Sequence, residues 1–83
     1  MIISSAAIMF SNGVVEGYNY TNIVSLAHKL GFYGDKQHGF TTNNGLFVYP
    51  DIAAKIAFKA GQIAEQVDEL TPEYIWPEWD NND

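Results

Sequence analysis

Residues 39–62, GFTTNNGLFVYPDIAAKIAFKAGQ, decide the fold because they contain a complete β-hairpin–helix unit. An extended run over residues 39–43 reaches Asn44 and Gly45. This dipeptide favours a tight turn because both residue types accept positive φ angles. A second extended run over residues 46–49 follows the turn, so the stretch predicts two short antiparallel strands.

The same stretch then predicts a helix. Pro50 suits the first helical position because proline has no N–H to leave unpaired there. Gly61 predicts the end of the helix because glycine adopts the left-handed conformation without steric cost. The apolar spacing predicts a buried stripe of five residues: Ile52, Ala53, Ile56, Ala57 and Ala60.

The preceding part of the chain repeats this plan. Residues 2–10 and 14–20 are expected to form strands around a turn at Asn12 and Gly13. Two-residue loops in both hairpins would pair Phe10 with Val15, Ile8 with Gly17, Thr42 with Phe47 and Phe40 with Tyr49.

A helix should follow the first hairpin, capped by Thr21 or Asn22 and ended by Gly31. Its predicted apolar stripe consists of Ile23, Leu26, Ala27 and Leu30. Aligning Gly31 with Gly61 superposes two similar helix ends, which either a duplication or shared capping rules would explain.

The element order is therefore ββαββα. The simplest arrangement is an α+β fold, with an antiparallel sheet of about four strands and both helices on one face. The chain of 83 residues is expected to form one domain. It comprises a first unit (1–38), a second unit (39–63) and an acidic aromatic tail (64–83).

The composition excludes several classes of function. The chain has no cysteine, so disulfides and thiolate metal sites are excluded. Its net charge is −6 with four basic residues, all lysine, so direct nucleic-acid binding is not expected. An acidic surface fits a basic partner, including a protein that itself binds nucleic acid, or simply provides solubility. With no secretory signal or membrane-length apolar run, we expect a cytoplasmic protein.

The residues typical of catalysis lack the required patterns. His28 and His38 have no metal-binding spacing, and the serines lack a nucleophile-elbow context. We therefore expect no catalytic residue, metal or cofactor, and the chain is not predicted to be an enzyme.

Two features are candidates for ligand binding. One is the polar hairpin tip with its neighbours, whose donors and acceptors could read a nucleobase or sugar edge. The other is a set of tyrosines near strand ends, including Tyr33 and Tyr49, which could stack a base. Ordinary turn chemistry and cross-strand packing are the alternative explanations. The candidate ligand-binding residues are Tyr18, Tyr20, His38, Thr41, Thr42, Asn43, Asn44 and Phe47.

The tail places large apolar side chains among acidic residues. It either folds over the sheet face that the helices leave open or contacts a second subunit in a homo-oligomer. The candidate interface residues are Tyr74, Trp76 and Trp79.

Residues 39–48, read as GF-x-T-x-x-G-x-FV, precede an Ala-rich helix that ends in Ala60-Gly61-Gln62. With the closing residues 73–76, EYIW, this pattern resembles a widespread group of small phage-encoded proteins. The resemblance implies a phage origin and a bacterial host cytoplasm. Small acidic phage proteins without catalytic residues are commonly inhibitors of host antiviral defence.

Two hypotheses about function follow. In the first, the protein is an oligomer that binds and sequesters a nucleotide-type signal. In the second, it is an acidic inhibitor that occupies the nucleic-acid-binding site of a host nuclease or CRISPR complex. The partner is accordingly a small molecule or a host defence protein, and neither a membrane nor nucleic acid itself.

Overall fold

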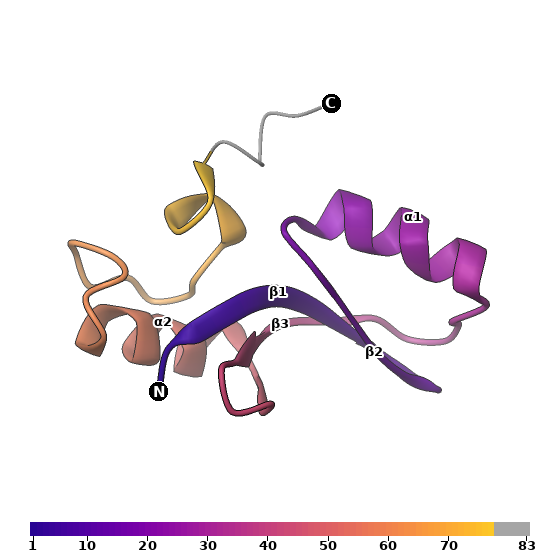
Figure 1. Ribbon diagram of the computed structural model, residues 1–83, viewed down its shortest axis with the longest axis horizontal. Helices are drawn as coiled ribbons and strands as arrows, with labels where there is room; N and C mark the ends of the chain where they lie inside the picture. Colours follow the sequence, from indigo (N-terminus) through magenta and orange to yellow (C-terminus); the bar gives the residue numbers. More distant parts are fainter. Residues whose placement is uncertain (78–83) are drawn as a thin grey trace.

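A computed structural model of the chain describes residues 1–77 and has the predicted α+β fold (Figure 1). Four strands form one antiparallel sheet in the order β2-β1-β3-β4. The elements are β1 (Ile3–Phe10), β2 (Gly13–Gly17), α1 (Tyr20–Leu30), β3 (Gln37–Thr42), β4 (Phe47–Val48), α2 (Pro50–Lys59) and the 3₁₀ helix η1 (Pro72–Tyr74). The predicted order ββαββα is confirmed.

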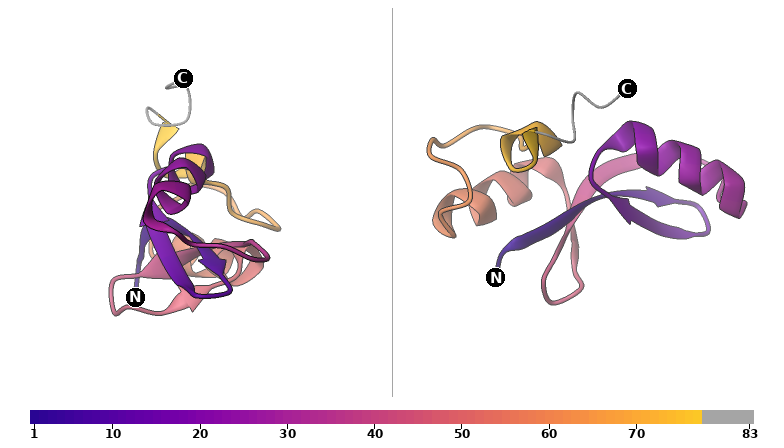
Figure 2. Two further views of the ribbon diagram at one scale, coloured as in Figure 1. Left: turned by 90° about the vertical axis from the view of Figure 1, so that its right-hand side faces the viewer. Right: turned by 45° about the horizontal axis from the view of Figure 1, so that its top comes forward.

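Both helices pack on one face of the sheet. Ala6 and Ile8 of β1 lie two residues apart, so they share a face, and Phe40 pairs with Ala6 on that face. The buried residues of α1 and α2 join these three in one hydrophobic cluster. Figure 2 (right) shows α1, η1 and α2 in a row along the same side of the strands.

The first hairpin turns earlier than predicted. Phe10 pairs with Gly13 and Ile8 with Val15, so Ser11 and Asn12 form the loop, and the predicted register is wrong by two residues. Gly13 lies outside the loop, and its lack of a side chain lets the Phe32 ring pack closely against it. Its φ is 145°, and an added Cβ would lie 2.8 Å from a ring carbon of Phe32.

The second hairpin has a three-residue loop instead of the predicted two. The Thr42 N–H donates to the Leu46 carbonyl at 2.9 Å, and Gly45 closes the loop with a φ of 85°. A loop ending in a left-handed residue shifts the register by one compared with a two-residue turn. The predicted pairs of Thr42 with Phe47 and Phe40 with Tyr49 are therefore wrong. Phe47 pairs with Thr41, and Val48 pairs with Phe40.

The helix ends follow the predicted rules, but the cap of α1 does not. Gly31 and Gly61 have φ angles of 86° and 79°, as their predicted roles require. Pro50 is the first residue of α2, as predicted. The N-cap of α1 is Asn19, whose side-chain oxygen accepts from the Asn22 N–H at 2.8 Å, so the caps predicted at Thr21 or Asn22 are wrong.

The buried stripes are narrower than predicted. In α1, Ile23 and Ala27 are buried, whereas Leu26 and Leu30 are 44% and 60% exposed. A helix resting on a sheet buries residues four apart, and its flanking positions face solvent. In α2 the buried residues are Ala53, Ala54 and Ala57; Ile56 is half-buried, and Ile52 and Ala60 are exposed.

The chain after α2 packs on the helix-bearing face. Ile63 and Leu70 belong to the hydrophobic cluster, and Trp76 packs against it. The Leu70 N–H donates to the Pro50 carbonyl at 3.0 Å. The described tail therefore does not cover the open face of the sheet, and that alternative is wrong. None of the helices within residues 1–77 has the length and apolar character needed to cross a membrane.

Candidate functional site

The predicted polar hairpin tip uses its side chains within the chain. The Thr41 hydroxyl lies 2.7 Å from the Ser5 hydroxyl, and the Asn43 side-chain oxygen accepts from the Ile2 N–H at 3.1 Å. The Thr42 hydroxyl donates to Asn44 and also accepts from the backbone of the loop. Thr41 and Thr42 are buried. These contacts explain the polar residues as turn and strand chemistry, and a ligand at the tip stays a prediction.

The predicted tyrosines have different aromatic partners. Tyr18 makes an edge contact with Trp76 at a centroid distance of 6.3 Å, and Phe47 makes one with Tyr49 at 6.0 Å. Tyr20 instead stacks on His38, with 4.2 Å between the ring centroids and 11° between the planes. Of the candidate residues, the structure thus brings Tyr20 and His38 together into one feature.

Three elements hold this stacked pair in place. Tyr20 is the first residue of α1, fixed there by the Asn19 cap. His38 of β3 pairs with Ile8, so its side chain lies on the helix-bearing face of the sheet. The Tyr20 hydroxyl donates to the Gly39 carbonyl at 3.0 Å, which ties α1 to β3.

A hollow opens directly beside the stacked pair. It has a volume of about 300 Å³ and is lined by Tyr20, Thr21, Val24 and His38. A second, separate hollow of about 150 Å³ also borders Val24, and its lining includes Phe10, His28, Phe32, Tyr33, Gly34 and Lys36. Because Val24 borders both, we treat the two hollows together as the α1 groove.

The α1 groove gathers positive and titratable groups in an acidic protein. Both histidines of the chain line it, His38 at one end and His28 at the other, where Lys36 also lies. Burial raises the pKa of Tyr20, and the nearby Glu73 carboxylate raises it further. The Tyr20 hydroxyl donates its hydrogen bond to the Gly39 carbonyl. The groove has aromatic surface at the His38 end and the Lys36 ammonium group at the other.

Sequence reasoning identified the residues at the His38 end of the groove and, at the other end, only Tyr33. Thr21, Val24 and His28 are spaced i, i+3 and i+7, which places them on one helix face and was the available signal. Lys36 and Phe32 come from the loop after α1, and no local pattern predicts which helix face that loop contacts. The predicted interface residue Tyr74 is half-exposed, Trp76 is half-buried, and Trp79 lies outside the described residues.

The described lining of the α1 groove combines one stacked aromatic pair with one lysine. No cluster of three or more potential metal ligands occurs in the part of the chain that the structure describes. His38 contacts an aromatic ring rather than a nucleophile. An aromatic platform with a separate cationic end suits a planar ring that carries an anionic group.

No protein-family model matches the chain, and no curated protein or solved structure matches it. The resemblance to small phage-encoded proteins therefore stays a prediction.

Proposed function

We propose that this chain is a non-catalytic, phage-type protein that antagonises bacterial antiviral defence by sequestering a nucleotide-type signal. The observation that carries the proposal is the α1 groove, where Tyr20 stacks on His38 beside a hollow of about 300 Å³. Stacking on aromatic side chains suits every nucleobase because each has a π-face. The binder acts in the bacterial host cytoplasm as a homo-oligomer.

The charge distribution sets the direction in which such a ligand binds. Glu73 lies close enough to Tyr20 to raise its pKa, so a phosphate is disfavoured at that end. His28 and Lys36 line the opposite end of the groove. The base accordingly stacks near His38, and the phosphate lies toward Lys36.

Calorimetry of the full chain against a panel of linear and cyclic nucleotides tests the proposal. We expect at least one nucleotide to bind, and His38→Ala to weaken it about tenfold because one stacking surface is lost. Tyr49→Ala is the matched control, since Tyr49 is an exposed aromatic residue that contacts Phe47 away from the groove. Native mass spectrometry of the same samples reports the oligomeric state. An absence of heat with every nucleotide would remove the proposal.

A second candidate is an acidic inhibitor of a protein that binds nucleic acid. The observation favouring it is a run of exposed acidic residues after α2: Glu65, Asp68 and Glu69 lie before η1, and Glu73 lies within it. Such a surface mimics the charge of a phosphate backbone. If the nucleotide panel fails, retention of one stoichiometric host protein that salt releases would favour this candidate.

A further inference from the structure

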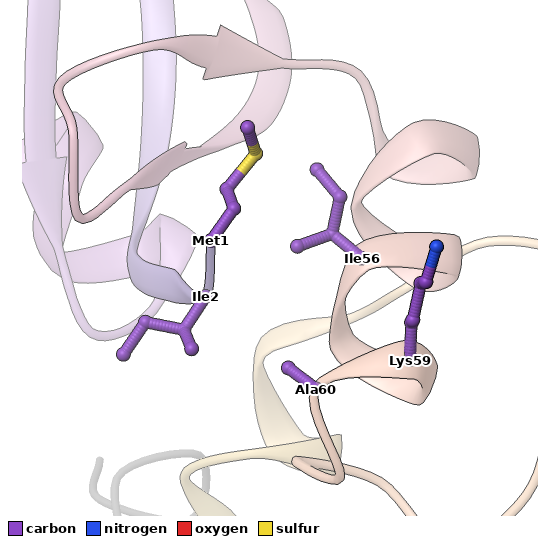
Figure 3. Close-up of a pocket in the computed structure, with 5 residues that line it drawn as sticks. All are labelled: Met1, Ile2, Ile56, Lys59 and Ala60. Carbon is purple, nitrogen blue, oxygen red and sulfur yellow. The ribbon is translucent and has the colours of Figure 1, made fainter.

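A separate hollow lies at the other end of the sheet from the α1 groove, between the start of β1 and the last turn of α2 (Figure 3). Met1 and Ile2 line one side, and Ile56, Lys59 and Ala60 line the other. Its volume is about 600 Å³. Small-molecule sites in proteins span about 300 to 1,000 Å³, so this hollow has the size of a binding site.

The walls of this hollow are apolar and open to water. Met1 is 61% exposed and Ile2 is 44% exposed, and Ile56 of α2 lies across the hollow from Met1. The inner face of α2 bears small alanines, which let the helix approach the sheet closely. The larger Ile56 lies on the flank of that contact. Apolar side chains from two segments therefore share one solvent-filled space, where a ligand would remove them from water.

One cation lies beside these apolar walls. Lys59 follows Ile56 by one helical turn, and within residues 1–77 no carboxylate lies within ion-pair distance of its ammonium group. Its side chain combines an apolar stem with a mobile charged head. Among the described residues the Lys59 ammonium group is open to pair with an anionic group, whereas the net charge of −6 disfavours an anion at longer range.

We propose that this hollow binds an amphipathic carboxylate with an unbranched acyl chain. The acyl chain lies against Met1, Ile2 and Ile56, and the carboxylate pairs with Lys59. The hollow has no aromatic lining residue, unlike the α1 groove, so it is not a second site for a nucleobase. The proposal is independent of nucleotide binding and adds a second ligand class to the protein.

NMR titration of the full chain with decanoate, below its micelle concentration, tests this site. We expect saturable shifts at the start of β1 and the end of α2, and an affinity about tenfold above that of octanoate because two more methylenes are buried. Decanol, which lacks the charge, should bind about two- to fivefold more weakly than decanoate. Acetate, which lacks the chain, should not bind.

Variants separate the two parts of the recognition. Lys59→Gln should lower decanoate affinity about two- to fivefold and leave decanol unchanged. Ile56→Asn should weaken both ligands, with its fold checked by circular dichroism. Lys55→Gln is the matched control, because Lys55 lies one turn earlier on α2 and does not line the hollow. The proposal is overturned if decanoate gives no saturable shifts, or if Lys59→Gln and Lys55→Gln have the same effect.

Discussion

The two hairpin–helix units share one plan but contact the sheet differently. α1 rests on Ile23 and Ala27, and an open groove runs along its flank. α2 rests on three alanines, and its inner face is closed. Turn and capping rules set the order of elements in both units. Each helix leaves a hollow beside it, and the two differ in lining: aromatic side chains line the space beside α1, and aliphatic ones line the space beside α2.

The ends of the two helices are equivalent, whereas their starts differ. The residue after the terminal glycine donates its N–H to Ala27 in α1 and to Ala57 in α2, at 3.0 Å and 2.8 Å. At the start, Asn19 caps α1 through its side chain, whereas Tyr49 makes no side-chain cap bond to α2. α2 begins with Pro50 instead, which fixes the backbone without a cap.

The largest effect on stability is expected where alanine residues let a helix pack closely against the sheet. Ala57→Leu should lower the free energy of unfolding by about 3 kcal/mol, the upper end of the range for overpacking, because Ala57 is fully buried under the α2 contact. Val24→Leu, on the flank of α1 that borders both hollows, should cost less than about 0.5 kcal/mol because the added methylene has space. Urea denaturation measures both, and equal losses would contradict the distinction between the closed inner face of α2 and the open flank of α1.

A smaller effect is expected at the helix starts. Asn19→Ala should destabilise the protein by about 1 kcal/mol because the Asn22 N–H loses its acceptor. Tyr49→Ala removes no cap bond and should change stability by less than about 0.5 kcal/mol. Thermal unfolding measures both substitutions. An equal loss of stability would show that the Asn19 side-chain cap does not make the start of α1 different from that of α2.

The smallest effect concerns the first helical residue, Tyr20 in α1 and Pro50 in α2. Burial and Glu73 raise the pKa of Tyr20, so the folded state holds the phenolic proton more tightly than the unfolded state. The stabilisation that comes from this pKa difference is fully present below pH 10, which is the pKa of Tyr20 in the unfolded state. It is lost as the pH rises above that value.

Tyr20→Phe should therefore make stability less dependent on pH between about pH 10 and 11. The difference from the unsubstituted protein should stay below about 1 kcal/mol because the ring is half-buried and solvent screens its charge. Urea midpoints across this range measure it. Identical slopes for the two proteins would show that Tyr20 titrates normally.

The sequence predicted the features that local rules control. Both terminal glycines, Pro50 and the order of the elements along the chain depend on neighbouring residues alone. The hairpin registers failed because Asn–Gly was assigned to a two-residue turn in each case, whereas Gly13 makes room for Phe32 and Gly45 closes a longer loop. Those outcomes depend on contacts from distant parts of the chain.

The same limit applies to the candidate sites. Tyr20 and His38 were predicted as separate candidates, but their stacking depends on the pairing of β1 with β3. Leu26 and Leu30 were predicted to be buried because they have helical spacing, and that spacing does not show how narrow the contact is. The positions of Lys36 and Lys59 beside hollows require the whole fold.

The amide of Gln62 joins the two units at their far ends. Its oxygen accepts from the Ile3 N–H at 2.7 Å, and its nitrogen donates to the Ile3 carbonyl at 2.9 Å. The Gln62 side chain thus makes the two hydrogen bonds to Ile3 that the backbone of a neighbouring strand would make. It links the start of β1 to the residue that follows Gly61, after α2. Gln62 therefore adds a contact between residues 59 apart in sequence to the β1–β3 pairing that already joins the two units.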